Sequence, residues 1–245
     1  MAIPRIHIAR PLAAGDAFGL PPDAARHVQV LRLQPGDGLT LFNGAGGEWQ
    51  ARVTRMGRAA VDVHVERHVD VDRELARHVT LAIGMPANER MDALVEKATE
   101  LGVGALQPLV CERSVLRLAG ERAEKRLAHW RGVAIAASEQ CGRTRIPEVR
   151  AVQPFAAWLE GSGPTAPGDS RRFVLSLDAS TRWDTRAAGP AGTALTLLSG
   201  PEGGLAPAEE DSARRAGFVA ITLGARVLRA DTAPLALLAW CGFEP

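Results

Sequence analysis

Apolar and polar residues alternate in short runs over about the first seventy residues of the chain. Such runs, separated by turns rich in glycine and aspartate, predict short β-strands, with one helix after the first of them. The predicted strands are Arg5–Ala9, Leu39–Asn43, Trp49–Met56 and Ala60–Val69, and the predicted helix is Pro22–Leu31. The pattern indicates a small barrel or twisted sheet. This is a common form of RNA-binding appendage, but a dimerisation module has the same pattern.

From Arg73 onward, predicted strands and helices alternate, which indicates a mainly parallel sheet covered by helices. One helix, capped by Asn88 and ending at Gly102, carries a single apolar stripe. The other predicted elements are strands at Val79–Met85, Gly104–Val110, Arg172–Leu177, Ala194–Leu198 and Phe218–Leu223, a long helix at Gly120–Cys141, a surface loop at Gly161–Ser170 and an apolar last helix at Pro234–Phe243. We therefore expect an α/β protein with domains at residues 1–72 and 73–245.

The composition is that of an ordinary globular protein, because 46% of the 245 residues are hydrophobic and 23% are charged. No apolar run approaches the roughly 20 residues that span a bilayer, and the first residues lack a secretory signal. We therefore expect a cytoplasmic protein without a membrane partner. The three cysteines, Cys111, Cys141 and Cys241, are far apart and form no CxxC pair, which predicts reduced thiols. His64 and His68 lie four residues apart, with His78 beyond them, but no carboxylate and cysteine residues complete a set of ligands, so we predict no metal site.

The charge distribution is uneven, although the net charge of +1 neither favours nor excludes a nucleic-acid partner. From Arg113 to Arg150, nine basic residues are opposed by four acidic residues. A local basic surface suits a phosphate-rich partner, but a solvated helix face has the same composition.

Two glycine-containing turns, Ser199–Gly204 and Leu223–Arg229, follow predicted apolar strands. Ligands of open α/β sheets bind beyond the carboxyl ends of strands, and glycine lets the main chain approach a ligand, so both turns are candidate cofactor walls. The alternative is that they are only tight connections. After the first turn a helix opens with Glu209, Glu210 and Asp211, whose charges repel a pyrophosphate. This disfavours a dinucleotide or ATP but not S-adenosylmethionine, which has no phosphate.

Five motifs in a fixed order give the sequence a specific resemblance. They are Glu96–Val103, Glu112–Ser114, Glu139–Arg143 with Ile146–Pro147, Gly200–Gly204 and Leu223–Arg229. Together they closely resemble the RsmE family, the 16S rRNA (uracil(1498)-N(3))-methyltransferases of the SPOUT superfamily. The GPEGG motif alone would be a moderate signal, but all five in register across the C-terminal two-thirds are a strong one. The N-terminal third is similar to the PUA-like barrel of that family.

The resemblance implies an enzyme that uses S-adenosylmethionine to methylate N3 of a uridine in 16S ribosomal RNA. It implies a PUA-like β-barrel followed by an α/β domain with a C-terminal trefoil knot, a rare exception to unknotted topology. It also implies a homodimer that acts on the small ribosomal subunit and not on DNA. The residues implied in cofactor binding are Leu175, Leu198, Ser199, Gly200, Pro201, Gly203, Gly204, Leu223, Gly224, Val227 and Leu228.

The reaction requires removal of the weakly acidic proton at N3 and stabilisation of the charge that spreads onto O2 and O4 of the uracil. Our hypothesis gives the stabilising role to Arg143, with a phosphate contact or a structural salt bridge as the alternative. Glu202 is the nearest carboxylate to the cofactor turn and is the candidate base, with bracing of the loop as its alternative. The candidates for RNA contacts are Arg5, Arg10, Arg113 and Arg229.

The sequence departs from the family pattern at three positions. Ala87 stands where a lysine is usual, which removes one RNA phosphate contact. Cys141 replaces a serine, and no histidine base flanks it, which discourages a nucleophilic role. Asp231 replaces a glutamate and is shorter, which weakens any role for that acid.

Three other functions remain open at this stage. A knotted methyltransferase acting on a tRNA base or a ribose 2′-hydroxyl would share the cofactor turn. A non-catalytic RNA-binding module would bind RNA but not the cofactor. A dinucleotide-dependent oxidoreductase is disfavoured by the missing glycine fingerprint.

Overall fold

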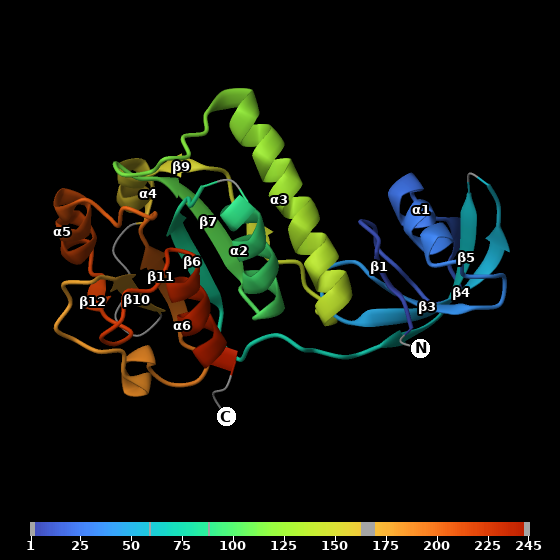
Figure 1. Ribbon diagram of the computed structural model, residues 1–245. Helices are drawn as coiled ribbons and strands as arrows, with labels where there is room; N and C mark the ends of the chain where they lie inside the picture. The colour runs from blue at the N-terminus through green and yellow to red at the C-terminus, as the bar shows by residue number, and fades with distance from the viewer. Residues whose placement is uncertain (1–2, 59, 88, 163–169, 243–245) are drawn as a thin grey trace. The chain divides into compact units, whose positions relative to one another are not determined.

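The computed structural model describes residues 3–58, 60–87, 89–162 and 170–242 (Figure 1). The chain divides into two compact units. The N-terminal unit comprises Met1–Glu74 and Ile135–Ile146, and the C-terminal unit comprises Leu75–Ala134 and Pro147–Pro245.

A five-stranded sheet in the order β1-β3-β4-β5-β2 forms the N-terminal unit. β1 pairs in parallel with β3, and the other neighbouring strands are antiparallel. The elements are β1 (Arg5–His7), β2 (Ala17–Gly19), α1 (Pro22–Val30), β3 (Gly38–Phe42), β4 (Glu48–Met56) and β5 (Val61–Val69). All except β2 agree with the predicted elements, and β2 was missed because Phe18 is its one large apolar residue and no apolar run surrounds it.

The alternation along β5 explains why this sheet has one buried face. Val61, Val63 and Val65 are buried, whereas His64 between them is exposed. Because successive side chains of a strand point to opposite faces, the valines reach one apolar core and the polar residues reach solvent. The helix α1 contributes Val28 to the same core.

The end of α3 (Gly120–Cys141) and the residues that follow it complete the N-terminal unit. The main-chain N–H of Gly46 donates to the carbonyl of Thr144 at 3.1 Å, and that of His7 donates to the carboxylate of Glu139 at 2.8 Å. These bonds attach the motif around Cys141 to the small sheet. The N-terminal unit is therefore discontinuous in the chain, a feature that the expected boundary between residues 72 and 73 does not include.

A parallel sheet in the order β12-β10-β11-β6-β7-β8 forms the centre of the C-terminal unit, and β9 also pairs with β7. All of these pairs are parallel, as the alternation of strands and helices predicts. The strands are β6 (Val79–Gly84), β7 (Ala105–Val110), β8 (Glu148–Val149), β9 (Gln153–Pro154), β10 (Ser170–Leu175), β11 (Ala194–Ser199) and β12 (Val219–Ile221). The other helices are α2 (Glu89–Glu100), α4 (Phe155–Gly161), η1 (Thr185–Ala188), α5 (Pro207–Arg215) and α6 (Thr232–Gly242).

Helices cover both faces of this sheet (Figure 1). On one face, Leu81 of β6 belongs to a core cluster that includes Leu94 of α2 and Leu238 of α6. On the other face, the adjacent Ala82 belongs to a cluster that includes Trp158 of α4. The C-terminal unit therefore has three layers, with the parallel sheet between two layers of helices.

Four short elements of the C-terminal unit were not predicted, namely β8, β9, α4 and η1. The two strands have two residues each, α4 has seven and η1 has four, which is too short for a periodic pattern. The predicted cap Asn88 and residues 163–169 of the predicted loop lie outside the described residues. Within the described part of the chain, no helix combines the length and the apolar character needed to cross a membrane.

Candidate functional site

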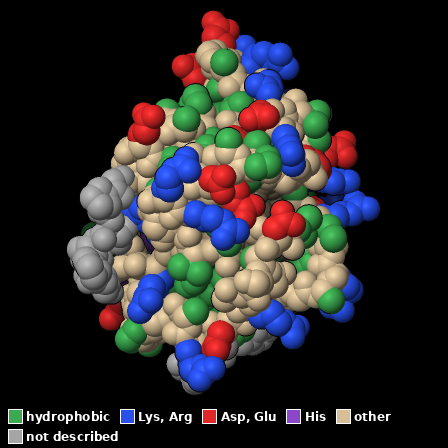
Figure 2. All heavy atoms as spheres, turned by 90° about the vertical axis from the view of Figure 1, so that its left-hand side faces the viewer, with side chains coloured by type: hydrophobic (Ala, Val, Ile, Leu, Met, Phe, Trp, Pro, Cys, Tyr) green, Lys and Arg blue, Asp and Glu red, His purple; other side chains and the backbone are tan. Residues whose placement is uncertain are grey.

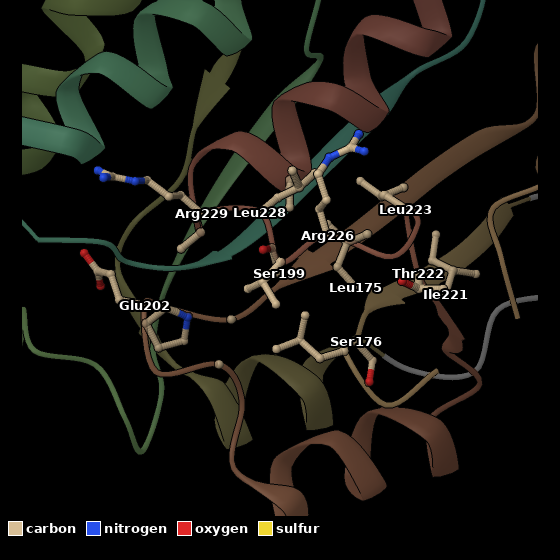
Figure 3. A pocket seen from close by; sticks show the side chains of 17 residues that line it. Leu175, Ser176, Ser199, Glu202, Ile221, Thr222, Leu223, Arg226, Leu228 and Arg229 are labelled. Atoms are coloured by element: carbon tan, nitrogen blue, oxygen red, sulfur yellow. The ribbon is translucent and has the colours of Figure 1, made fainter. Parts of the chain in front are cut away.

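Three adjacent parallel strands end at one pocket (Figure 3). Leu175 is the last residue of β10, Ser199 of β11 and Ile221 of β12, and all three line the pocket. Because β10 pairs in parallel with both β11 and β12, the carboxyl ends of the three strands lie at one edge of the sheet. Open α/β sheets bind ligands at such an edge.

The pocket wall is mainly apolar side chain and main chain. The apolar lining residues are Leu175, Leu177, Ile221, Leu223, Val227, Leu228, Ala230 and Ala233. The turn contributes Gly200, Pro201 and Gly204, and the polar lining residues are Ser176, Ser199, Glu202, Thr222, Arg226 and Arg229. An apolar wall with a few polar groups is typical of a site for a small organic ligand.

Most residues predicted to bind the cofactor line this pocket. They are Leu175, Ser199, Gly200, Pro201, Gly204, Leu223, Val227 and Leu228. Leu198, Gly203 and Gly224 are not among its lining residues, and Leu198 is completely buried in the core. Sequence reasoning missed Ser176, Leu177, Ile221, Thr222, Arg226, Ala230 and Ala233. The first four end or directly follow a strand, so the carboxyl-end rule was the signal that could have found them.

Two glycines let the GPEGG turn pack closely against the sheet. A Cβ atom on Gly200 would lie 2.5 Å from the main-chain nitrogen of Leu205, and one on Gly84 would lie 2.6 Å from that of Pro201. Real Cβ atoms essentially never come within 3.0 Å of such atoms, so a side chain at either position requires the main chain to shift. Gly84 and Gly200 therefore set the position of one wall of the pocket.

The loop after β7 and the first turn of α5 brace the GPEGG turn. Nη1 of Arg113 donates to the carbonyl of Gly203 at 3.0 Å. The carboxylate of Glu209 accepts from the main-chain N–H of Glu112 at 2.9 Å and from that of Ala206 at 3.0 Å. Arg113, a predicted RNA contact, is thus attached to the cofactor turn. One of the three acids at the start of α5 serves as a bridge between two loops.

Glu202 lines the pocket and is also hydrogen-bonded to the neighbouring loop. Its Oε1 atom accepts from the main-chain N–H of Ala87 at 2.9 Å, and Nη1 of Arg90 lies 3.8 Å from the same oxygen. Figure 3 shows the Glu202 carboxylate and the Arg229 guanidinium projecting toward the same side of the pocket. Both alternatives for Glu202, chemistry and bracing of the loop, are compatible with this position.

The second glycine turn is attached to the chain that leaves β10. The main-chain N–H of Thr222 donates to the carbonyl of Thr181 at 2.9 Å. Gly224 has a φ of +127°, in the region that favours glycine, and the chain then turns toward the pocket. Arg226 and Arg229 both line the pocket, but Figure 3 shows their guanidinium groups pointing in different directions.

Two predicted RNA contacts, Arg5 and Arg10, belong to the N-terminal unit and have protein partners there. Arg5 forms an ion pair with Glu48 and donates through Nη2 to the carbonyl of Arg143 at 2.8 Å. The guanidinium of Arg10 lies 3.7 Å from the carboxylate of Asp16. The Arg5 side chain is only 13% exposed, so it presents little of its guanidinium to solvent.

Arg143, the predicted charge-stabilising residue, forms an ion pair with Glu74. The arginine is 4% exposed, and its Nε atom lies 3.2 Å and 3.1 Å from the two carboxylate oxygens of Glu74. Both residues belong to the N-terminal unit. The geometry favours the structural salt bridge, which was the alternative for Arg143, because a buried charge needs a fixed partner.

The cysteines are free thiols, and Cys111 and Cys241 are buried whereas Cys141 is half-buried. Burial raises the pKa of the Cys111 thiol to about 12, and the nearby charge of Glu209 acts in the same direction. A thiol with this pKa is protonated at neutral pH and is a poor nucleophile.

The face of the C-terminal unit that carries α5 mixes acidic and basic side chains (Figure 2). On α5 itself, Nη2 of Arg214 lies 2.5 Å from the carboxylate of Glu210. Paired charges of this kind do not make a continuous basic surface.

Comparison with known proteins identifies the family. Residues 73–242 match the RNA methyltransferase domain family, and residues 20–66 match the RNA methyltransferase PUA domain family. Ribosomal RNA small subunit methyltransferase E of Synechocystis sp. is 34% identical over 220 residues, which cover 86% of this chain and 67% of that protein. The chain belongs to the ribosomal RNA small subunit methyltransferase E family.

Two solved structures are similar to this chain over nearly its whole length. The ribosomal RNA small subunit methyltransferase E of Neisseria gonorrhoeae, bound to S-adenosyl methionine, is 36% identical with a TM-score of 0.89, covering 98% of this chain and 96% of that chain. A putative methyltransferase of Legionella pneumophila in complex with the same cofactor is 31% identical with a TM-score of 0.90, covering 98% and 97%. The resemblance inferred from the five motifs is confirmed, as is an α/β protein with a PUA domain.

Proposed function

We propose that this chain transfers a methyl group from S-adenosylmethionine to N3 of a uridine in the 16S RNA of the small ribosomal subunit. The observation that carries the proposal is the pocket at the carboxyl ends of β10, β11 and β12, which the GPEGG turn and the LGARVLR segment both line. The choice of N3 of uridine rests on the five sequence motifs.

The pocket residues fit the cofactor. Apolar walls from Leu175, Leu223 and Leu228 suit an adenosine, and the main chain of the GPEGG turn approaches closely because Gly200 has no side chain. Glu202 is the one acidic residue in the lining, and it suits a sulfonium cation better than a phosphate. When bound, the cofactor supplies an electrophilic methyl group. The pocket residues orient it and exclude water.

Glu202 is our proposal for the group that takes the N3 proton. The Ala87 N–H occupies Oε1, and Oε2 has no hydrogen-bond donor among the described residues, so one oxygen can accept a proton from the uracil. Arg229 projects toward the same side and can stabilise the charge that develops on the uracil oxygens. The carboxylate would take the N3 proton, and the electron pair left on N3 would bond to the methyl carbon as the methyl–sulfur bond breaks, which would leave the sulfur as a neutral thioether.

Replacement of Glu202 by glutamine tests this assignment. We expect the variant to keep the hydrogen bond from Ala87 and to bind S-adenosylmethionine only about threefold to tenfold more weakly, because the charge near the sulfonium is lost. Turnover should fall by about a hundredfold or more. Near-normal turnover would remove the role as a base and leave only the bracing of the loop.

We also propose the trefoil knot and the barrel of the SPOUT and PUA-like folds. The strand order supports the knot, because the chain leaves β11, forms β12 beside β10, and then returns so that α6 packs in the cluster that contains β11. In the N-terminal unit, five paired strands around one apolar core, with register shifts between β4 and β5, support a barrel.

A homodimer is our proposal for the assembly. The last helix, α6, is apolar on nearly every side, yet Leu235 and Trp240 are only partly buried and Ala236 is exposed. A second copy of the chain would cover these residues. Sedimentation analysis at micromolar concentration tests the proposal, and a purely monomeric protein would contradict it.

The decisive experiment combines cofactor binding with product analysis. Calorimetric titration of the purified protein should show saturable binding of S-adenosylmethionine and none of NADH. Incubation with small subunits from cells that lack the methyltransferase should then yield N3-methyluridine in the nucleosides of the 16S RNA. Methylation of a ribose 2′-hydroxyl or of tRNA would assign the chain to another knotted methyltransferase. RNA binding without cofactor binding would assign it to the non-catalytic class.

A further inference from the structure

An exposed patch at the end of α1 combines apolar side chains with arginines. We call it the α1 patch and define it as Arg26, Val30, Leu31, Arg32 and Arg58. Val30 is 71% exposed and Leu31 is 43% exposed, which makes them two consecutive large apolar residues in solvent. Neither belongs to the apolar core of the N-terminal unit. Consecutive exposed apolar residues at the end of a helix indicate a contact surface.

The members of the patch are held next to one another. Arg26 and Val30 are four residues apart on α1, so they share one face of the helix. The side-chain amide of Gln29 donates to the carbonyls of Gly57 at 2.8 Å and Arg58 at 3.2 Å, which fixes the turn between β4 and β5 against the helix. Arg58 is therefore placed beside the end of α1.

The arginines of the patch differ from those on the neighbouring strands. Within the described residues, Arg26, Arg32 and Arg58 form no ion pair and donate no side-chain hydrogen bond, and all three are exposed. By contrast, the exposed strand arginines have partners, since Arg52 pairs with Glu66 and Arg55 with Asp62. Three unpaired guanidinium groups beside apolar side chains are a site for an anion with an apolar part.

Arg32 has a main-chain conformation that its residue type disfavours. Its φ is +57°, and it is the only non-glycine residue with positive φ in the described part of the chain. Glycine is the usual residue at this position after a helix, because a side chain costs energy in the left-handed region. Arg32 therefore carries an exposed guanidinium at a position where glycine would be less strained.

We propose that the α1 patch is a docking surface for the sugar–phosphate backbone of the ribosomal RNA substrate. The inference rests on the proposed function, since RNA is the partner. Charge complementarity selects this partner, because three unpaired arginines attract phosphates while Val30 and Leu31 pack against sugars or unstacked bases. The patch supplies affinity and register for the RNA, and the methyl transfer itself takes place elsewhere.

The test compares two triple variants of the full-length protein. The patch variant carries Arg26→Ala, Arg32→Gly and Arg58→Ala. The control variant carries Arg52→Ala, Arg55→Ala and Arg67→Ala, which removes the same formal charge from β4 and β5 of the same unit. Methylation kinetics use small subunits that lack the modification, and filter binding of the free 16S RNA is measured from 50 to 300 mM salt.

We expect the patch variant to raise KM for the RNA about tenfold or more, with kcat within twofold of the parent. Loss of three phosphate contacts should flatten the slope of log K against log salt by roughly 2 to 3. The control variant should change KM by less than threefold. Calorimetry with S-adenosylmethionine and the thermal midpoint monitor folding, and Arg32→Gly alone should leave that midpoint unchanged or higher.

Each alternative outcome has a distinct meaning. An unchanged KM and an unchanged salt slope in a folded patch variant would overturn the proposal. Equal losses in the patch and control variants would also overturn it, because they would show a general effect of charge. A change in sedimentation without a change in RNA affinity would also overturn it, because the patch would then be a contact between copies. If the parent protein itself methylates no RNA, the proposed function fails instead.

Discussion

Alanine in place of Gly200 is the sharpest test of the pocket, because the clash it creates involves main-chain atoms only. The new Cβ atom would lie 2.5 Å from the nitrogen of Leu205 and 2.7 Å from the carbonyl carbon of Gly204. Restoring an ordinary contact of 3.4 Å requires a shift of about 0.9 Å. No side-chain rotation can supply this shift, so the turn itself must open.

A shift of this size changes both stability and binding. Overpacking of a well-packed site costs about 1–3 kcal/mol. A displacement of about 1 Å at a binding wall is enough for a tenfold to hundredfold loss, and each factor of ten corresponds to about 1.4 kcal/mol. We therefore expect Gly200→Ala to weaken S-adenosylmethionine binding at least about tenfold while the protein remains folded.

Calorimetric titration measures this loss, and two other glycines provide matched controls. Gly204 lies in the same turn with a φ of +70° but has open space at its Cβ position, so Gly204→Ala adds strain without a clash. Gly132 lies in α3 with nothing near its Cβ position, so Gly132→Ala should stabilise the helix by about 0.5–1 kcal/mol and leave binding unchanged. Binding by Gly200→Ala within twofold of the parent would refute the reasoning.

Three further predictions follow from other contacts. Arg113→Ala should weaken S-adenosylmethionine binding about threefold to tenfold in calorimetry, because Nη1 of Arg113 holds the Gly203 carbonyl of the cofactor turn. The salt dependence of RNA binding should stay unchanged. A loss of RNA affinity without a loss of cofactor affinity would instead support the phosphate contact that the sequence predicted for Arg113. Glu74→Gln should lower the free energy of unfolding by about 3 kcal/mol in a urea titration, since it removes the negative charge that faces the buried Arg143 guanidinium. A change below about 0.5 kcal/mol would contradict the structural role. Cys111 should resist iodoacetamide at pH 8 until the protein unfolds, whereas early labelling would contradict its raised pKa of about 12. Because the folded pKa is raised, the thiol's contribution to stability is complete below the unfolded pKa of about 9 and is lost as pH rises toward 12.

Local patterns predicted most of the elements. The strands β4 and β5 and the long helix α3 have a periodicity that depends only on neighbours in sequence, and they appear where the sequence predicts them. The strands β8 and β9 were missed because two residues cannot show a period, and β2 was missed because Ala17–Gly19 lies in no apolar or alternating run. Their pairing partners, which lie elsewhere in the chain, decide that these residues are extended.

The roles of individual arginines could not be predicted in the same way. Arg5 lies 43 residues from Glu48 in sequence, and Arg143 lies 69 residues from Glu74, yet these pairs occupy the guanidinium groups. The basic stretch around Arg143 therefore suggested a catalytic cation where the structure has a buried salt bridge. Arg26, Arg32 and Arg58 received no role from the sequence, because an unpaired guanidinium is recognised only when every neighbour is known.

The sequence by itself determined the class of fold, the family and the two glycine turns that line the pocket, because strand endings and glycine are local signals. Only the tertiary structure decided that β10, β11 and β12 end at one edge, that residues 135–146 join the N-terminal unit, and which charges are paired. The physical reason is the same in each case. Pairing of strands and of charges depends on distances between residues far apart in the chain, and those distances exist only in the folded protein.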